Sequence, residues 1–242
     1  MNFIKNIFAP VVKLLRPIVY VPLLNVLVFF YHYIPDLGAV IIILTILIRL
    51  LFVRSFHKSL KQQKIMQSLQ PKINEIKAKY KDDKQKEMQA MMELYKENEV
   101  SPFSSCSSLL FQLPVLVALS TLFSRASSDA ILHDLYSFIP HISHINPIAF
   151  GLVDLSAKNN YILVGIAAIL QYAQARLTLP KQKSTDPMQN SMQTSMLYFF
   201  PVMLFVSILS LPAGLALYII ITTLFSVAQQ YYIIRKDAQE SL

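Results

Sequence analysis

The sequence is poor in the residue types on which several common classes of protein depend. Its 242 residues include one cysteine, Cys106, and four glycines. A single cysteine excludes an internal disulfide framework and any multi-cysteine metal site, and so few glycines argue against a glycine-rich phosphate loop. Only 15% of the residues are charged, against about 25% in an ordinary soluble domain. A soluble enzyme is therefore not expected.

The sequence is rich in apolar residues. They make up 54% of the chain, and the mean hydropathy is +0.46. This balance predicts an all-α membrane protein in which several apolar helices share the chain with one polar segment.

Long uncharged runs predict five membrane-spanning helices. The longest run, 187–234, has 48 residues, and one helix of that length would be about 70 Å long, more than twice the ~30 Å hydrocarbon core. The run must therefore turn back once, and Pro212 followed by Gly214 predicts the position of this turn. The predicted spans are 36–56, 105–124, 159–179, 192–211 and 213–234.

The distribution of lysine and arginine predicts the orientation. Residues 54–104 hold 11 of these cations, whereas 125–158 hold only Arg125 and Lys158 beside three aspartates. Because cytoplasmic loops carry the excess of positive charge, we expect the loop 125–158 outside. The segments 57–104 and 180–191 and the tail 235–242 are then expected in the cytoplasm.

The N-terminal segment, 1–35, allows two interpretations. Residues 18–34 are apolar, but Pro22 and Asn25 interrupt them, and no small-residue cleavage site of the secretory type follows. One interpretation is an amphipathic helix lying on the outer membrane surface, with its aromatic residues at headgroup level. The other is a signal anchor, which would give six crossings.

The polar segment 57–104 has the periodicity of two surface helices. Apolar residues recur at spacings of three and four, and the break at 81–83 predicts an antiparallel helical hairpin. The two stripes are Ile65, Leu69, Ile73, Ile76 and Tyr80 in the first helix and Met88, Met91, Met92 and Tyr95 in the second. The lysines form either a solvated face or a docking surface for anionic lipid or ribosomal RNA, and the methionines could receive varied apolar partners. No pattern indicates sequence-specific nucleic-acid binding.

Arg49 lies inside the first predicted span. Such a charge costs about 2.5–3.5 kcal/mol on insertion scales and indicates function by default, although Arg49 could also extend toward the cytoplasmic interface near Arg54. Polar residues in the spans, with no acidic residue among them, indicate a hydrophilic recess, while each serine or threonine singly could be interhelical packing. They are Thr45, Gln112, Gln171, Gln174, Ser207, Ser210, Thr222, Thr223 and Ser226.

Patterns for catalysis or metal binding are absent from the sequence. His133, His141, His144 and Asp134 share the external loop, but their spacing fits no metal motif. Cys106, at the entrance of a span, is interpreted as a small packing residue. We therefore expect neither an enzyme nor a cofactor.

Seven short motifs, in this order, resemble the YidC/Oxa/Alb family of membrane protein insertases over about 22–232. They are IIILTILIR (41–49), LQPKINEIKAKYKDD (69–83), MMELYKENEVSP (91–102), LLFQLP (109–114), TDPMQ (185–189), LPAGLALY (211–218) and Gln229-Gln230. The sequence departs from the family around 101–106, where members often have Asn-Pro and a Gly-Gly-Cys-like run.

The resemblance implies a five-helix core around a groove open to the cytoplasm and to lipid but closed on the outside. Arg49 matches the family's groove arginine, and Gln112 and Gln174 match polar positions of the second and third spans. Residues 22–34 match an amphipathic helix on the outer surface, which favours the interfacial interpretation, and 57–104 match the cytoplasmic hairpin. Unlike Gram-negative members, the chain is expected to lack a large extracytoplasmic domain. Its tail has no net charge, which disfavours ribosome binding by the route that basic tails provide.

The functional hypothesis is an insertase or chaperone that acts without nucleotide in a bacterial plasma membrane. Nascent membrane proteins would be its clients, and the Sec translocon and the ribosome are further candidate partners. The alternative is a small transporter or channel in which Arg49 binds an anion, although no internal repeat or acidic proton relay supports it. The sequence does not separate insertion from chaperoning.

Overall fold

The computed structural model describes residues 16–101, 104–125, 134–140, 145–178 and 194–240. These residues are mostly helical, which confirms the all-α class at that level, with two short strands added to it. The helices are η1 (Arg16–Tyr20), α2 (Val21–Tyr33), α3 (Leu37–Leu51), α4 (Val53–Ser68), α5 (Gln70–Lys79), α6 (Lys84–Glu97), α7 (Ser104–Arg125), α8 (Tyr161–Thr178), η3 (Ser195–Phe199), α10 (Phe200–Leu209) and α11 (Ala213–Glu240). The strands β1 (Ile148–Ala149) and β2 (Val153–Asp154) pair antiparallel.

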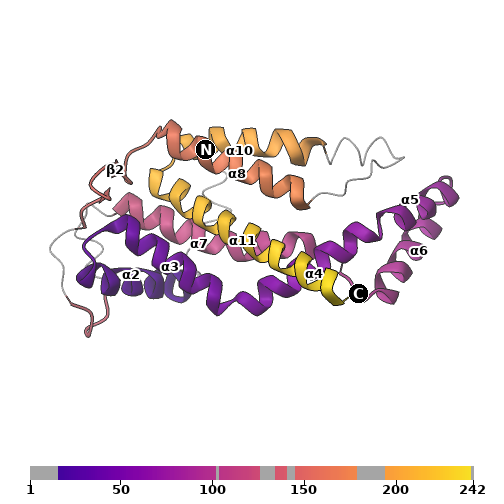
Figure 1. Ribbon diagram of the computed structural model, residues 1–242, viewed down its shortest axis with the longest axis horizontal. Coiled ribbons are helices and arrows are strands. Elements are labelled where there is room, and N and C mark those ends of the chain that lie inside the picture. The colour runs from indigo at the N-terminus through magenta and orange to yellow at the C-terminus, as the bar shows by residue number, and fades with distance from the viewer. Residues whose placement is uncertain (1–15, 102–103, 126–133, 141–144, 179–193, 241–242) are drawn as a thin grey trace.

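Helix α11 is the central element of the bundle. It packs against α3, α7, α8 and α10 (Figure 1). The core between these helices is apolar, and Ile41, Leu122, Val164 and Leu215 are buried in it. Each such side chain makes many close contacts, which are individually weak but together hold the helices against one another.

The chain turns back between α10 and α11, at Pro212. Helix α10 ends at Leu209, and α11 begins at Ala213. Gly214 lets α11 approach α7 closely, because a Cβ at this position would stand less than 3 Å from ring carbons of Phe123. Helix α11 continues to Glu240, so the helix is longer than the predicted span 213–234. Neither proline nor glycine follows to stop it.

The first predicted span, 36–56, is not one straight helix. Helix α3 ends at Leu51, α4 starts at Val53, and the two axes are bent by 69°. The next interruption falls at Leu69, with Pro71 in the first turn of α5, where a proline is tolerated because the first amides of a helix lack partners. The single first arm expected for the hairpin is therefore divided between α4 and α5.

Helices α5 and α6 pack side by side around a small separate core. Leu69, Ile73, Leu94 and Val100 are buried there, and Ile65, Met66, Ile76, Met91 and Tyr95 pack partly buried against them. Met88 and Met92 are 67% and 61% exposed. The predicted stripe of α6 is therefore interrupted, because the helix turns Leu94 inward and leaves Met88 and Met92 on its open face.

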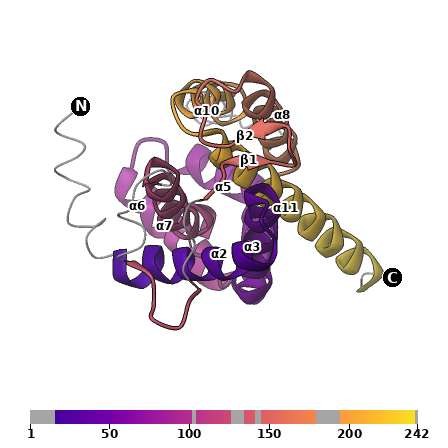
Figure 2. The same ribbon diagram turned by 90° about the vertical axis from the view of Figure 1, so that its left-hand side faces the viewer.

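Helix α2 lies across one end of the bundle, the end that faces the viewer in Figure 2. The strand pair is fastened at the same end. Asp36 caps α3 by accepting from the Ala39 amide at 2.9 Å, and it also accepts from the Phe150 amide at 2.5 Å. The hydroxyl of Tyr31 in α2 accepts from the amide of Asn146 at 2.9 Å. These bonds join α2, α3 and the strand pair into one cap.

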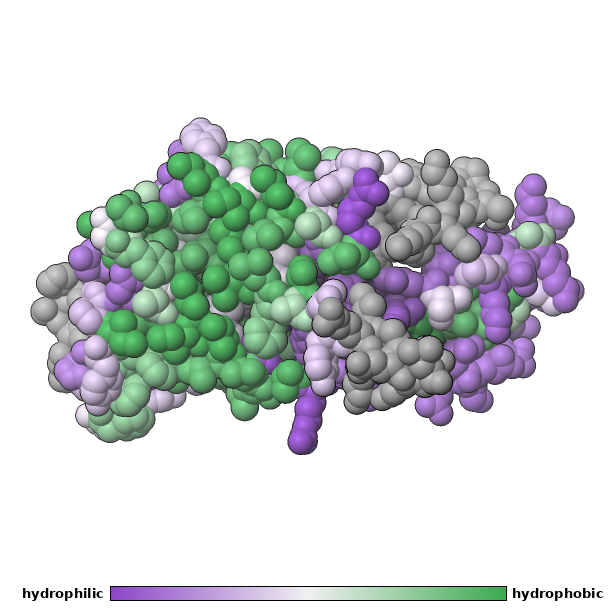
Figure 3. Space-filling view, in the orientation of Figure 1, coloured by the Kyte–Doolittle hydropathy of each residue, from purple (hydrophilic) through white to green (hydrophobic). Residues whose placement is uncertain are grey.

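The face of the bundle that Figure 3 presents is largely apolar. Figure 3 shows hydrophobic residues over the bundle and hydrophilic ones at the end that carries α5 and α6. Within the described residues, one helix is long and apolar enough to cross a membrane, Ala213–Tyr232, and the bent α3–α4 pair adds a second if it is counted as one span. Shorter apolar stretches lie at Pro114–Phe123, Tyr161–Leu177 and Leu197–Leu209.

Candidate functional site

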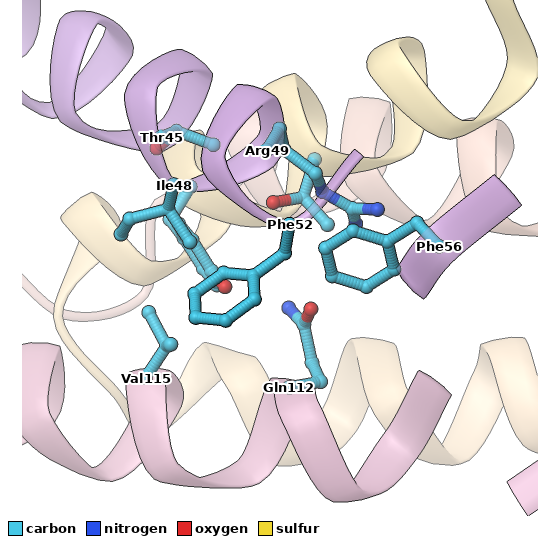
Figure 4. Close-up of a pocket in the computed structure, with 9 residues that line it drawn as sticks. Thr45, Ile48, Arg49, Phe52, Phe56, Gln112 and Val115 are labelled. Carbon is cyan, nitrogen blue, oxygen red and sulfur yellow. The ribbon is translucent and has the colours of Figure 1, made fainter. Parts of the chain in front are cut away.

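Arg49 is a buried cation in the last turn of α3. The residue is 7% exposed, and its guanidinium carbon lies 4.3 Å from the centroid of the Phe56 ring (Figure 4). In the described part of the chain, ion pairs include those of Arg16, Lys84 and Lys86, and none of them involves Arg49. The face of an aromatic ring is therefore its principal described partner.

A pocket opens beside the guanidinium. Its lining residues are Thr45, Ile48, Arg49, Phe52, Phe56, Gln112, Val115, Tyr218 and Thr222. The space that can receive a water-sized molecule is about 40 Å³, and a water needs roughly 10–15 Å³ measured in this way. The pocket therefore has room for about three or four waters.

Helical spacing explains how three parts of the chain supply this lining. Thr45, Arg49, Phe52 and Phe56 follow one another at intervals of four, three and four residues, so they remain on one side as α3 passes into α4. Gln112 comes from α7, and its amide points toward Arg49 and Phe56 in Figure 4. Tyr218 and Thr222 are one turn apart on α11.

The hydroxyl groups at the pocket differ in their hydrogen bonding. Oγ1 of Thr45 donates to the carbonyl of Ile41 at 2.6 Å, within its own helix. Oγ1 of Thr222 is buried and makes no hydrogen bond of standard length and angle with the described residues. A buried hydroxyl left unbonded costs about 1–3 kcal/mol, and a water in the adjoining space would satisfy it. The arrangement is suited to hold water and polar groups next to a positive charge.

The structure brings together some of the residues singled out in the sequence and not others. Arg49, Thr45, Gln112 and Thr222 line the pocket, whereas Gln171, Gln174 and Ser207 are not among its lining residues. Gln171 and Gln174 are half-buried on α8, and Ser207 is exposed and donates to the carbonyl of Met203 at 2.7 Å. Ser226 donates in the same way to the carbonyl of Thr222 at 3.0 Å.

Sequence reasoning missed the aromatic part of the lining, which is Phe52, Phe56 and Tyr218. The signal that could have found them is spacing, since Phe52 and Phe56 are three and seven residues after Arg49 and Tyr218 is four before Thr222. The histidines His133, His141 and His144 lie outside the described residues. Cys106 belongs to α7.

The apolar surface, the end cap formed by α2 and the enclosed arginine define a class of protein. It is a helical membrane protein with a small pocket beside a buried arginine between its helices. Comparison with known families gives the particular family, because residues 29–240 match the one described as 60Kd inner membrane protein. The chain belongs to this family.

Several curated relatives are named membrane protein insertase YidC. The protein of Geotalea daltonii is 36% identical over 216 residues, which are 88% of this chain and 36% of the relative. That of Geobacter sulfurreducens is 34% identical over 218 residues, 88% of this chain and 36% of the relative. That of Nitratidesulfovibrio vulgaris is 35% identical over 219 residues, 89% of this chain and 38% of the relative. The chain thus spans little more than a third of the length of these relatives.

Proposed function

We propose that this protein inserts client membrane proteins into a bacterial plasma membrane and helps them fold, using the pocket at Arg49 as part of a hydrophilic groove. The observation that carries the proposal is a buried arginine beside space for water, without a carboxylate partner among the described residues. A cation held in this way is available to an acidic or polar segment that enters the groove. The names of the relatives support the same function.

The proposed membrane arrangement has five spans, supplied by α3, α7, α8, the η3–α10 pair and α11. Exposed apolar side chains on α3, α8 and α10 support it, among them Leu51, Ile169 and Val206. Helix α2 lies on the outer surface, in keeping with its position across the end of the bundle. The loop 125–158 is then outside, and α5, α6 and the C-terminus are in the cytoplasm.

Several of these helices are short for a membrane span. Helix α3 has 15 residues and α8 has 18, so they rise about 22 and 27 Å, against a hydrocarbon thickness of ~30 Å. A bilayer becomes thinner around apolar elements that are too short for it. Such thinning would shorten the apolar distance that a polar segment of a client has to cross.

The groove would act by replacing water around the client's polar groups. A short external segment of the client must leave water to cross, and unsatisfied polar groups in hydrocarbon cost several kcal/mol each. Arg49, Gln112 and Thr222 would supply charge and hydrogen bonds on the way. The client's apolar helix would then move into lipid, driven by its own burial of about 25 cal/mol per Å². No step needs a nucleotide.

The two ends of the bundle differ in a way that supports a groove closed on the outside. Ile139, Ile145, Ala149 and Leu155 are buried with α2 and the start of α11 in the main core. At the opposite end, α5 and α6 expose Met88 and Met92, which could receive apolar client segments, since methionine adapts to varied surfaces. The Sec translocon and the ribosome are proposed further partners on this side.

Reconstitution into liposomes tests the proposal. A small single-span client with an acidic external segment is offered to the wild-type protein, to Arg49→Ala and to Arg49→Lys. We expect insertion by the wild type, partial insertion by Arg49→Lys, which keeps the charge, and loss with Arg49→Ala. Arg54→Ala is the matched control, because Arg54 is exposed and lies outside the pocket.

Two results would contradict the proposal. Equal insertion by all variants would show that the charge of Arg49 is not used. If the wild-type protein is folded and still inserts no client, it does not carry out insertion on its own.

A further inference from the structure

Residues 134–140 form a short loop with two different sides. Leu135 packs partly buried against the main core, and Ile139 is buried in it. Tyr136 and Phe138 are instead 40% and 77% exposed. Their rings stack on each other, with centroids 5.4 Å apart and planes 27° apart. The loop thus presents a preformed aromatic pair, hereafter the aromatic tip, on a base that the core holds in place.

The loop is also fastened to α2. Asn25 is buried at 2% exposure, and it accepts from the amide of Tyr136 at 2.7 Å and donates to the carbonyl of Asp134 at 3.0 Å. The guanidinium of Arg16 donates to both carboxylate oxygens of Asp134, at 2.8 and 3.0 Å. Both bonds come from one nitrogen, Nη2, and hydrogen bonds between ionised groups are stronger than those between neutral ones. The aromatic tip therefore keeps a defined position relative to α2.

This position is at the side of the bundle. Figure 1 and Figure 2 both show the loop reaching past α2 and away from the long helices. Helix α2 and the turn before it carry exposed apolar residues of their own, Ile18, Phe29 and Tyr33. Phe29 and Tyr33 also contact each other edge to face, with ring centroids 5.3 Å apart. The tip is thus a second exposed aromatic group at the end of the bundle where α2 lies.

We propose that the aromatic tip, Tyr136 and Phe138, inserts into the lipid interface beside α2 and anchors the external loop to the membrane. Phenylalanine exposed to this degree in water is unfavourable, whereas aromatic rings are enriched where headgroups meet acyl chains. Tyr136 keeps a hydroxyl for the headgroup side. The occupant is lipid, because Asn25 holds the tip beside α2, whose own exposed apolar residues lie at the same end of the bundle. The inference rests on the proposed membrane arrangement.

The chain offers a clean test, since it contains no tryptophan. A Phe138→Trp variant in nanodiscs built with a tryptophan-free scaffold protein gives a sample with one indole, whose emission reports its surroundings. Lipids brominated close to the headgroup quench an indole at the interface, and iodide quenches one in water. Ile169→Trp on α8, where Ile169 is 70% exposed, is the control for the lipid-facing bundle, and Met88→Trp on α6, at 67% exposure, is the control for water.

We expect blue-shifted emission from position 138, severalfold stronger quenching by the brominated lipid than by iodide, and no such preference at position 88. Adding Arg16→Gln to the Phe138→Trp variant should loosen the loop and raise the iodide quenching. Quenching by iodide alone overturns the proposal, because the tip would then lie in water. Shielding from both quenchers also overturns it, because a second copy or another protein would then cover the tip.

This test is independent of client insertion. Because Ile169 lies about 12 Å along α8, its control uses lipids brominated deep in the acyl chains; if position 169 is quenched by iodide and not by these lipids, the proposed membrane arrangement itself is wrong. If 169 is quenched by lipid and 138 is not, only the anchoring role of the tip fails.

Discussion

Replacing Arg49 with methionine is expected to stabilise the fold while it abolishes the proposed insertion activity. The arginine is 7% exposed, and its guanidinium rests on Phe56 at 4.3 Å. Placing an arginine within a membrane costs about 2.5–3.5 kcal/mol on insertion scales, and a desolvated cation–π contact returns about 0.5–2 kcal/mol. The difference favours the apolar side chain by roughly 0.5–3 kcal/mol. Methionine is long and flexible enough to fill most of the vacated space.

The assay is unfolding by SDS in mixed micelles, followed by far-ultraviolet circular dichroism, together with the liposome insertion assay on the same preparations. Arg54→Met is the control, because Arg54 is exposed and its replacement should change stability by less than about 0.5 kcal/mol. Opposite effects of Arg49→Met on stability and insertion would show that the arginine is kept for function. If Arg49→Met lowers stability instead, the arginine holds the fold together, and the reasoning is refuted.

Two further predictions concern the frame around the site. Gly214→Ala should destabilise the bundle by about 1–3 kcal/mol, because the added methyl would meet the buried ring of Phe123. Adding Phe123→Leu to this variant should recover part of the lost stability. Gly165→Ala is the control: the space around Gly165 is open, so this change should leave stability unchanged in the same SDS titration. The hydrogen bond from the Lys86 side chain lowers the pKa of the Asp83 carboxyl. The stabilisation that this bond gives to α6 is therefore complete above the ordinary aspartate pKa of about 3.9 and is lost as the pH falls through the lower pKa of the folded protein. Asp83→Ser still caps the helix, and it should remove this acid sensitivity of the thermal midpoint. An unchanged pH profile of the midpoint would contradict the role given to the Asp83–Lys86 pair.

Local signals in the sequence predict the helices better than their bends. Pro212 and Gly214 mark the turn into α11, because proline lacks an amide hydrogen and glycine permits close approach. The bend at Phe52 has no such signal, since proline and glycine are absent around it. The bend coincides with contacts between α4 and distant parts of the chain. The side-chain amide of Gln229 donates to the carbonyl of Val53 at 3.2 Å, 176 residues away.

Asn25 is a second residue whose structural role could not be predicted from its sequence neighbours. In the sequence it only interrupts an apolar run, and in the structure it joins α2 to the loop that holds Asp134 and Tyr136. Polar residues within apolar helices are conspicuous in a sequence because their burial is costly. Their hydrogen-bond partners cannot be recognised in the sequence, because those partners come from segments far away in the chain.

The sequence by itself determined the helical class, the family resemblance and the place of Arg49 as an isolated charge in an apolar run, since composition, periodicity and an isolated charge can each be read locally. Only the tertiary structure decided which polar residues meet that charge. It selected Thr45, Gln112 and Thr222, placed Phe56 over the guanidinium, and left Ser207 on the surface. The physical reason is that the rotation and crossing of packed helices depend on the contacts of all the helices together, whereas hydropathy is a property of each residue alone.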